Sequence, residues 1–464
     1  MQPSIRIPRI HVLASAVAMA LAPGAAFGSG FALSQQSAKE QGSAYAGAAA
    51  SARDGSAVWF NPAGMVHFDR PTATAGVHGI YPQNHFQNDG STSPYLGGQE
   101  IPGRNSNDGA TSAIVPQLFY IHPVNDDLAY GIGINVPFGL GSEYEEDWVG
   151  RYHTVESELQ TVNINPSMAY RHSDRISLGI GFNVQYASAT LRNKIDGGAI
   201  CQQATADPTC SGQVSPSDPD DDSELELDGD SWAFGVNLGV LAQVTERTRV
   251  GLAYRSEMRH NLDGEASFER SDSVNNAVVN PATGLTLGGA LDGQGQFTDQ
   301  DASTQVILPE TVMLSAVHET TSRLNLMGDI SWTRWSRLDE LVFTFEDGQP
   351  EAVEEFDWQD TYRYSVGLTY DLLPSLQLRT GLAYDEAPVR NEKKRSPRVP
   401  DNDRTWYTLG LGYKMNNGLE LDAAFTYIAI DDPEIENTNS QGHTLIGEYD
   451  SEVSIFSVGG TWRF

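Results

Sequence analysis

From residue 71 to the C-terminus, large apolar residues alternate with small or polar residues in one segment after another. In segment 128–138 every second residue is apolar, and the residues between them are mostly Ala, Gly and Asn. Segments 176–186 and 419–427 show the same period of two. Successive side chains of a strand point to opposite faces, so this pattern predicts about fourteen strands of roughly 10 to 20 residues.

The connections between the predicted strands alternate between short and long. The short ones are 123–126, 172–174, 245–248, 319–322, 372–375 and 415–418, and the long ones are 82–111, 139–154, 193–222, 269–301, 346–356, 386–402 and 431–448. Short turns at one end and long loops at the other are typical of outer-membrane barrels, as are aromatic residues near the strand ends, such as Tyr130, Tyr170 and Trp462. We therefore predict an all-β, antiparallel transmembrane barrel over residues 71–464, and a half-buried soluble sheet is the alternative.

Residues 29–70 do not alternate and are rich in Ala, Gly and Ser. Segment 45–52 favours a helix, but neighbouring glycines divide the region into short pieces. The Asn61-Pro62 pair predicts a turn, because proline fixes its own φ and restricts the residue before it. We interpret residues 29–70 as a hatch that plugs the barrel, with a separate domain or a linker as alternatives.

Residues 1–28 have the features of a secretory signal peptide. Arg6 and Arg9 precede the apolar run 10–21, which is too short to span a bilayer as a helix. Small residues at Ala26 and Gly28 indicate cleavage before Ser29. The mature chain is therefore expected to be exported, and a signal anchor is the alternative.

Composition excludes several classes of partner. The 464 residues include 29 basic and 61 acidic side chains, so the formal net charge is −32, and it becomes −34 without Arg6 and Arg9. Such a charge argues against binding to nucleic acid or to an anionic membrane surface. Mean hydropathy is only −0.36, and a barrel is compatible with this value because only alternate residues of its strands meet lipid.

The sequence predicts a disulfide and no cofactor, metal site or enzyme. Cys201 and Cys210 lie nine residues apart in a polar stretch, and in an oxidising compartment we expect them to form a disulfide. Metal binding by this pair is the weaker alternative, and the acidic run 218–222 does not match a calcium loop. The chain contains no G-x-S-x-G, H-E-x-x-H or phosphate-binding loop. A lipase or protease site assembled across strands remains the alternative.

Short motifs distributed along the chain resemble those of the FadL family, which are outer-membrane transporters of long-chain fatty acids and, in some relatives, of hydrocarbons. The resemblance begins at Asn61-Pro62-Ala63 and covers most of the chain after residue 28. The other matching segments are Phe68-Asp69-Arg70-Pro71, Phe138-Gly139-Leu140, Tyr254-Arg255-Ser256-Glu257, Leu308-Pro309-Glu310, Asp360 with Tyr362 and Arg363, Pro388-Val389, Pro400-Asp401 with Asp403-Arg404 and Trp406, and the terminal Trp462 and Phe464.

This resemblance implies a monomeric fourteen-stranded barrel with an N-terminal hatch and a sideways exit for a hydrophobic ligand. The exit would lie where the third strand kinks, at Pro137, Phe138, Gly139 and Leu140, against the hatch turn Asn61-Pro62-Ala63. Proline removes a ladder donor and glycine weakens a strand, so the residue types suit a break. A strand that simply ends at its loop is the alternative. The resemblance also implies that Phe31 and Leu33 line the ligand pocket.

Charged residues on the inner face have two interpretations. Alternation points Arg363, Arg379, Asp329, Glu420 and Asp422 inward. Such charges must be paired or hydrated, so an ionic network that braces the hatch is the first interpretation. Contact between Arg363 or Arg379 and a ligand is the second.

A fatty-acid carboxylate would need a basic partner, for which Arg192 and Lys194 at the mouth of the fifth strand are candidates. The family has a basic group just before the tenth strand, whereas this chain has Glu351, Glu354 and Glu355 there. This departure keeps a neutral hydrocarbon open as the ligand. The basic run 390–398 is either a solvated loop or a contact for lipopolysaccharide phosphates.

We therefore predict an outer-membrane transporter of a Gram-negative bacterium that takes up hydrophobic compounds, most of all long-chain fatty acids. Its ligand would be captured by the extracellular loops and leave by lateral diffusion. Alternatives are a hydrocarbon transporter of the same family, a general porin and a surface adhesin.

Overall fold

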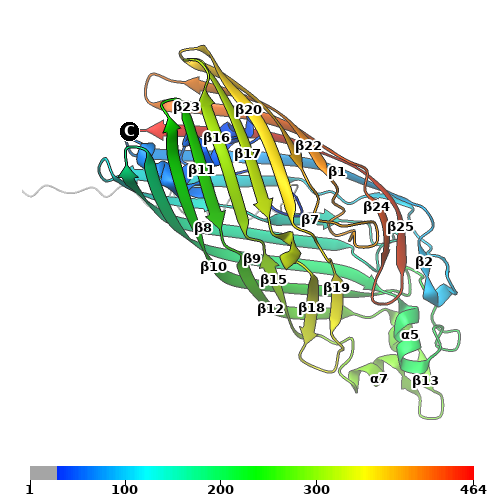
Figure 1. The fold of residues 1–464 in the computed structure, drawn as a ribbon. Coiled ribbons are helices and arrows are strands. Elements are labelled where there is room, and N and C mark those ends of the chain that lie inside the picture. Colours follow the sequence, from blue (N-terminus) through cyan, green and yellow to red (C-terminus); the bar gives the residue numbers. More distant parts are fainter. Residues whose placement is uncertain (1–28) are drawn as a thin grey trace, which may run out of the picture.

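A computed structural model describes residues 29–464, and the predicted signal peptide, 1–28, lies outside the described residues. Fourteen antiparallel strands form a closed barrel (Figure 1). The barrel closes where β1 (Thr72–Asn88) pairs with β25 (Thr444–Arg463) along its whole length. The strands between them are β5 (Ala113–Pro123), β6 (Leu128–Asn135), β8 (Glu156–Ser173), β9 (Ile176–Ile195), β10 (Ser223–Thr245), β11 (Thr248–Arg255), β16 (Thr311–Glu319), β17 (Leu324–Thr333), β20 (Thr361–Leu373), β21 (Leu376–Asp385), β22 (Arg404–Lys414) and β23 (Leu419–Ile430).

The end of the barrel away from the C-terminus carries the long connections (Figure 1). Several of them contain strands that lengthen the wall: β4 (Ser106–Asp108), β7 (Gly139–Glu143), β12 (Met258–Glu269), β15 (Gln300–Leu308), β18 (Glu340–Phe345), β19 (Ala352–Glu355) and β24 (Glu434–Thr438). The remaining loop elements are β2 (Thr92–Ser93), η2 (Pro94–Leu96), β3 (Gln99–Glu100), α5 (Gly197–Thr205), α6 (Asp272–Asn276), β13 (Val278–Asn280), β14 (Leu285–Thr286), α7 (Leu287–Asp292) and η3 (Trp335–Arg337). The predicted loops 82–111 and 346–356 are therefore partly strand, because the wall continues beyond the alternating segments.

The alternation of apolar and polar residues along the strands places them on the two faces that a membrane barrel requires. On β9, Leu178 and Phe182 are exposed on the outer surface, whereas Ser177 and Asn183 are buried in the lumen. Apolar side chains therefore face outward and polar side chains inward, the reverse of a soluble protein. None of the helices in the described part of the chain has the length and apolar character needed to cross a membrane.

Residues ahead of β1 form short helices inside the barrel: α2 (Ala38–Gln41), α3 (Ala48–Ser51), α4 (Ala57–Phe60) and η1 (Pro62–His67). Only Ala48–Ser51 of the Ala-rich segment 45–52 is helical, because Gly47 begins this helix with a left-handed φ of 75° and Ala52 ends it with a φ of 47°. Most side chains of residues 29–70 are buried. In the following text, the hatch means residues 29–70.

The Asn61-Pro62-Ala63 turn fixes the hatch to the barrel wall. The Asn61 side chain accepts a hydrogen bond from the Ala63 N–H and donates to the carbonyls of Ala49 (2.7 Å) and Val240 (3.0 Å). It thus joins two hatch segments to β10. A Cβ at Gly239 of β10 would collide with the Asn61 amide, so close approach of the turn requires glycine there.

A buried ion cluster joins α2 to the wall. Lys39 lies 2.8 Å from Glu420 and 3.7 Å from Asp422 on β23, and Arg379 of β21 lies 2.6 Å from Asp422. All four side chains are at most 6% exposed. Two cations and two carboxylates therefore neutralise one another at the contact between hatch and barrel.

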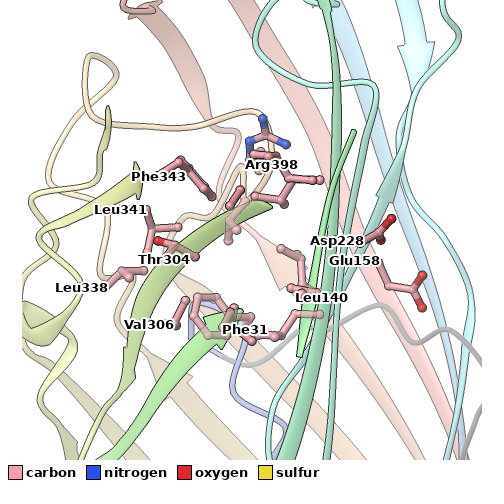
Figure 2. A pocket seen from close by; sticks show the side chains of 18 of the residues that line it. Phe31, Leu140, Glu158, Asp228, Thr304, Val306, Leu338, Leu341, Phe343 and Arg398 are labelled. Carbon is pink, nitrogen blue, oxygen red and sulfur yellow. The ribbon is translucent and has the colours of Figure 1, made fainter. Parts of the chain in front are cut away.

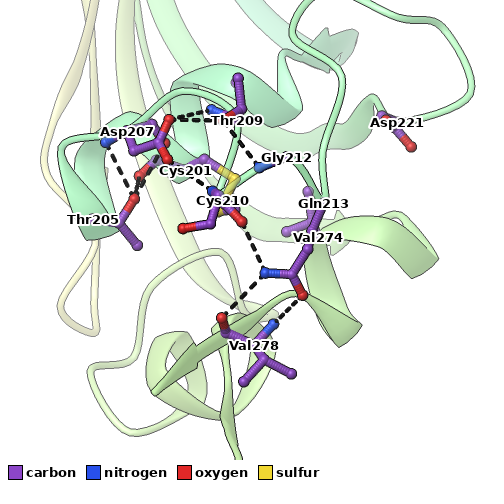
Figure 3. Close-up of a disulfide and its surroundings, with 12 residues drawn as sticks. Cys201, Thr205, Asp207, Thr209, Cys210, Gly212, Gln213, Asp221, Val274 and Val278 are labelled. Carbon is purple, nitrogen blue, oxygen red and sulfur yellow. Dashed lines mark hydrogen bonds between the residues drawn. A yellow bond between two sulfur atoms is a disulfide. The ribbon is translucent and has the colours of Figure 1, made fainter. Parts of the chain in front are cut away.

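A second small core lies in the loops beyond the barrel. The Cys201 and Cys210 sulfurs form a disulfide, with Cα atoms 5.4 Å apart, at the end of α5 (Figure 3). Both cysteines are buried in a cluster with Val274 of α6 and Leu287 of α7. The disulfide thus links two parts of one loop, and this loop packs on the next.

Candidate functional site

The third strand of the barrel is interrupted. β6 ends at Asn135, paired with Asn163 of β8, and pairing with β8 resumes only at Gly139 of β7. The alternation predicts one strand over residues 128–138, but the structure shows that the strand ends at Asn135. Pro137 has no N–H to donate, which makes an uninterrupted ladder impossible at this point.

The other side of this break lacks ladder partners as well. β5 pairs with β6 only from Leu118 to Pro123, although residues 113–117 of β5 still pair with β1. Among residues 29–464, β7 is joined on this side only by an isolated bridge from Ser142 to Ala110. The wall is thus weakest between β5 and β7.

The first residues of the hatch take the place of the missing ladder partner. Leu33 donates its N–H to the Pro137 carbonyl (2.8 Å), and Gly139 donates its N–H to the Phe31 carbonyl (3.1 Å). Phe138 itself donates its N–H to the Thr161 hydroxyl of β8 (3.0 Å). The break and the N-terminal segment therefore form one hydrogen-bonded unit, and displacement of one disturbs the other.

An apolar cavity, here named the outer cavity, lies between the loops and this unit (Figure 2). Phe31 and Leu140 lie on the side of the break in Figure 2, and Phe343 and Leu341 lie opposite. The other apolar residues of its lining are Leu159, Ala189, Leu191, Leu227, Leu262, Ala302, Val306, Leu338, Phe356 and Val399. A cavity with this lining suits a hydrophobic small molecule.

A second cavity, named the inner cavity, lies between the hatch and the barrel wall. Leu33 and Pro62 of the hatch line it together with Phe138 of the break. Its wall also carries Arg363 and Asp385, so it is more polar than the outer cavity.

Phe31 lies where the two cavities approach each other. Its ring is 5.0 Å from the ring of Trp335, 5.7 Å from that of Trp358 and 6.2 Å from that of Phe138. Phe31 lines the outer cavity, whereas Leu33 and Phe138 line the inner one. The four rings form a buried aromatic barrier between the two cavities.

Of the candidate residues for a charged head group, Arg192 and Lys194 line neither cavity. Lys194 lies 2.6 Å from Glu224 and 3.1 Å from Glu146, and Arg192 is 3.3 Å from Glu156. Both cations are therefore neutralised at the loop end of the wall.

The two inward arginines are separated. Arg363 lines the inner cavity and donates to the Ala44 carbonyl (2.9 Å). Arg379 lines neither cavity and belongs to the ion cluster of Lys39, Glu420 and Asp422. Of the two, only Arg363 is within reach of a molecule in a cavity.

Three residues of the site were not found from the sequence. Trp335 and Trp358 carry no local signal, because they meet Phe31 across about 300 residues of chain. Arg398 lies inside the basic run 390–398, yet it is turned inward onto the outer cavity. There its Nε is 3.0 Å from Glu354, and its Nη1 donates to the hydroxyls of Thr154 and Ser157. Glu354 thus neutralises the cation of the outer cavity.

The loops above the outer cavity are joined by a buried polar contact. His443 Nε2 is 2.9 Å from Asp196, which also accepts from the Ser217 hydroxyl (2.6 Å), and the Tyr152 ring stacks on His443. Burial alone would raise the pKa of Asp196, but these two hydrogen bonds lower it on balance. The contact ties three loops together. No group of His, Cys, Asp and Glu within residues 29–464 has the arrangement of a metal site.

Residues 19–464 match the family described as outer membrane protein transport protein (OMPP1/FadL/TodX). The outer membrane protein P1 of Haemophilus influenzae is 33% identical over 433 residues, covering 89% of this chain and 88% of its own. The long-chain fatty acid transport protein of Escherichia coli O6:H1 is 32% identical over 417 residues, covering 89% and 90%. The crystal structure of a Pseudomonas aeruginosa FadL homologue superposes with a TM-score of 0.83 at 25% identity, covering 94% of this chain and 100% of the other.

These findings confirm the predicted fold class, the outer-membrane location and the prediction of a transporter, not an enzyme. The chain belongs to the OMPP1/FadL/TodX family of outer-membrane transport proteins.

Proposed function

We propose that this protein takes up long-chain fatty acids and releases them sideways through the break in the third strand. The observation that carries the proposal is the position of Phe31 and the break next to the apolar outer cavity. In this route the ligand enters the outer cavity, displaces the aromatic barrier, reaches the inner cavity and leaves between β5 and β7. The E. coli relative named as a long-chain fatty acid transport protein supports this choice of substrate.

Physical chemistry favours a sideways exit over a central channel. Each buried CH₂ group of a ligand is stabilised by roughly 0.8 kcal/mol relative to water, so an apolar chain that moves from the outer cavity directly into lipid avoids the loss that it would meet in water. The buried hatch occupies the lumen, with side chains such as Gln36, Lys39 and Tyr45 almost inaccessible to solvent. This filling argues against a general porin, which requires an open lumen.

The test is uptake of radiolabelled oleate by cells that lack their own transporter. We expect wild type to restore uptake and deletion of Gly139 to abolish it, because the deletion joins β6 to β7 with a shorter break and removes the N–H that binds Phe31. Deletion of Gly98 is the matched control, since this exposed glycine lies in a loop with no atom near its Cβ position. Loss of uptake in both variants, or in neither, would contradict lateral exit at the break.

A neutral hydrocarbon is the second candidate, and the pairing of Arg398 with Glu354 favours it. The other charged residues of the outer cavity, Glu158 and Asp228, are acidic and would repel a carboxylate. Parallel uptake of labelled toluene separates the two substrates. Toluene uptake without oleate uptake would keep the route and change the ligand. Uptake of neither by a correctly assembled barrel would favour a surface adhesin.

We propose that the protein acts as a monomer whose loops meet lipopolysaccharide. Pairing of β1 with β25 leaves no open sheet edge for a second copy. Within the basic run, Arg395 and Arg398 are buried, whereas Arg390 and Lys393 are exposed and are the candidates for phosphate contact. Replacement of both by Gln should weaken binding of purified lipopolysaccharide if this contact exists.

A further inference from the structure

The inner cavity contains a cation whose partners are all neutral. Arg255, the last residue of β11, lines this cavity. Its Nη2 donates to the Trp59 carbonyl (2.6 Å), its Nη1 donates to the Asn183 side-chain oxygen (3.4 Å), and its guanidinium carbon lies 3.1 Å from the centre of the Trp59 ring. Within residues 29–464, no carboxylate oxygen lies within 4.0 Å of an Arg255 nitrogen. A charge held away from water is unfavourable unless it is paired, so an anion beside Arg255 would stabilise the site.

The second cation of this cavity has a different environment. Arg363 lies opposite Asp385 in the ladder between β20 and β21, and both residues line the cavity. Asp385 is the only carboxylate among the described residues of the lining. Its charge repels another carboxylate near Arg363, whereas Arg255 lies three strands away along the wall. The unbalanced positive charge of the inner cavity therefore lies at Arg255.

Asn237 of β10 provides a second hydrogen-bond donor beside Arg255. The two residues are paired in the ladder between β10 and β11, and Asn237 also lines the cavity. Asn237 is 2% exposed, and its side-chain oxygen accepts hydrogen bonds from Asn165 (2.9 Å) and Asn183 (3.1 Å), which fix the orientation of the amide. Its side-chain nitrogen has no acceptor within residues 29–464. A buried donor without an acceptor is unfavourable, so this nitrogen also favours a ligand oxygen.

We infer that Arg255 and the side-chain nitrogen of Asn237 bind the carboxylate of a fatty acid in the inner cavity. The inference rests on the proposed uptake of fatty acids and adds to it a residue pair that recognises the charged end of the substrate. A carboxylate has two oxygens, and both accept hydrogen bonds from guanidinium and amide groups. Paired residues on one face of neighbouring strands are close enough to contact the same carboxylate.

A row of asparagine side chains leads from this site to the break. Asn163 donates to the side-chain oxygens of Asn183 (3.1 Å) and Asn135 (3.1 Å), and Asn135 is the last residue of β6. Asn135 in turn donates to Gln36 of the hatch (2.8 Å). From Asn237 on β10 to Asn135 on β6 the row crosses three strand spacings, roughly 14 Å. The carboxylate site is thus separated from the break but lies on the same inner wall.

The position of the site determines how a long ligand lies in the inner cavity. Leu33 and Phe138 line this cavity beside the break, so an apolar chain whose carboxylate is bound at Arg255 extends toward these two residues. The methyl end of the chain then leaves between β5 and β7 first, and the carboxylate is released last. Lipid therefore receives the apolar chain while the charged end is still paired with a cation.

The test uses purified protein in a neutral detergent and two radiolabelled ligands with the same chain, oleate and oleyl alcohol. We expect Arg255→Met to weaken binding of oleate at least about tenfold and to change binding of oleyl alcohol little, because only the anion loses a charge-assisted hydrogen bond. Asn237→Asp keeps the side-chain oxygen and replaces the nitrogen by a second oxygen, so it should also weaken oleate selectively. Equal weakening of both ligands, or unchanged binding of oleate, would overturn the inference.

Arg249→Met is the matched control. Arg249 is another arginine of β11 that donates to hatch carbonyls, those of Ala50 (3.5 Å) and Ser51 (3.4 Å), but it lines neither cavity. This variant should bind both ligands as wild type does. A loss of oleate binding as large as that of Arg255→Met would show a general effect of removing an arginine from β11 and would overturn the inference.

A second measurement uses wild type alone, so it does not depend on the assembly of a variant. A fatty acid with a photoreactive diazirine beside its carboxyl group is bound to the purified protein and irradiated, and the labelled peptides are mapped by mass spectrometry. We expect labelling of β10 and β11 near Asn237 and Arg255, and labelling confined to residues of the outer cavity would overturn the inference. Uptake of oleate is measured separately. Uptake without these binding results contradicts the carboxylate site alone, whereas these binding results without uptake contradict the transport proposal alone.

Discussion

Replacement of Arg379 by Met is expected to loosen the hatch from the barrel wall. Arg379 is completely buried and lies 2.6 Å from Asp422 and 3.6 Å from Glu420. Its removal leaves Lys39 as the single buried cation beside two carboxylates. Leaving a buried charge without its partner typically costs about 3–5 kcal/mol. Because the cluster lies between α2 and the barrel, we expect this loss in hatch docking as well as in unfolding.

Arg463→Met is the control, because it removes a second arginine from the same carboxylate. Arg463 lies 3.4 Å from Glu420 and is 34% exposed, so its ion pair should contribute at most about 1 kcal/mol. Its bond to the Arg53 carbonyl is also only partly buried. The two variants therefore differ mainly in the burial of the charge that they remove.

Urea unfolding in lipid vesicles, followed by tryptophan fluorescence, measures the loss of stability. Ion conductance of single barrels in a planar bilayer measures release of the hatch. We expect Arg379→Met to lower stability more than Arg463→Met and to raise conductance. Adding Asp422→Asn to Arg379→Met should recover part of the loss, because it restores charge balance. Equal stability of the two single variants, within about 0.5 kcal/mol, would refute this account of the cluster.

Three further predictions concern the hatch turn and the loops. Gly239→Ala should displace Asn61 and lower stability by about 1–3 kcal/mol in the same urea assay, whereas Gly229→Ala, where the nearest atom is 3.4 Å away, should change little. Replacing Cys201 and Cys210 by Ser should destabilise their loop by roughly 2–3 kcal/mol, seen as faster cleavage in limited proteolysis, with no change in cleavage of the barrel turns. Burial, together with the charges of His443 and Arg398, lowers the pKa of His153 to about 3. Because the imidazole of the unfolded chain titrates near pH 6.5, the contribution of neutral His153 to folding stability is complete above about pH 6.5 and is lost as the pH falls toward 3. Loop proteolysis should therefore accelerate at acidic pH, and His153→Gln should make it less dependent on pH.

Much of the fold could be predicted from the sequence because the lipid imposes a local rule. Residues such as Leu178 and Phe182 must face outward, and this requirement recurs at every second position of each strand. The Asn61-Pro62 turn was also predictable, since its geometry follows from proline. Alternation did not predict the break after Asn135, because Val136 and Phe138 continue the apolar period although the backbone leaves the ladder.

The site was harder to predict because it is built from distant segments. Whether a cation is available depends on its partner: Arg192 and Lys194 look free in sequence, but Glu224 and Glu146 bind Lys194 from separate loops. Arg398 in a hydrophilic run points inward because Glu354 neutralises it. No local pattern contains such a pairing, so charges inside a barrel cannot be assigned from alternation alone.

The hatch is held by three kinds of contact that respond differently to a ligand. The ion cluster at Lys39 and the turn at Asn61 are buried away from the outer cavity, and neither residue lines it. The segment from Ser29 to Leu33, by contrast, lies against both cavities and binds the break through main-chain hydrogen bonds. A ligand that displaces Phe31 therefore competes with contacts of this segment and leaves the ion cluster and the turn intact. Opening should accordingly be local, so ligand addition should not raise ion conductance.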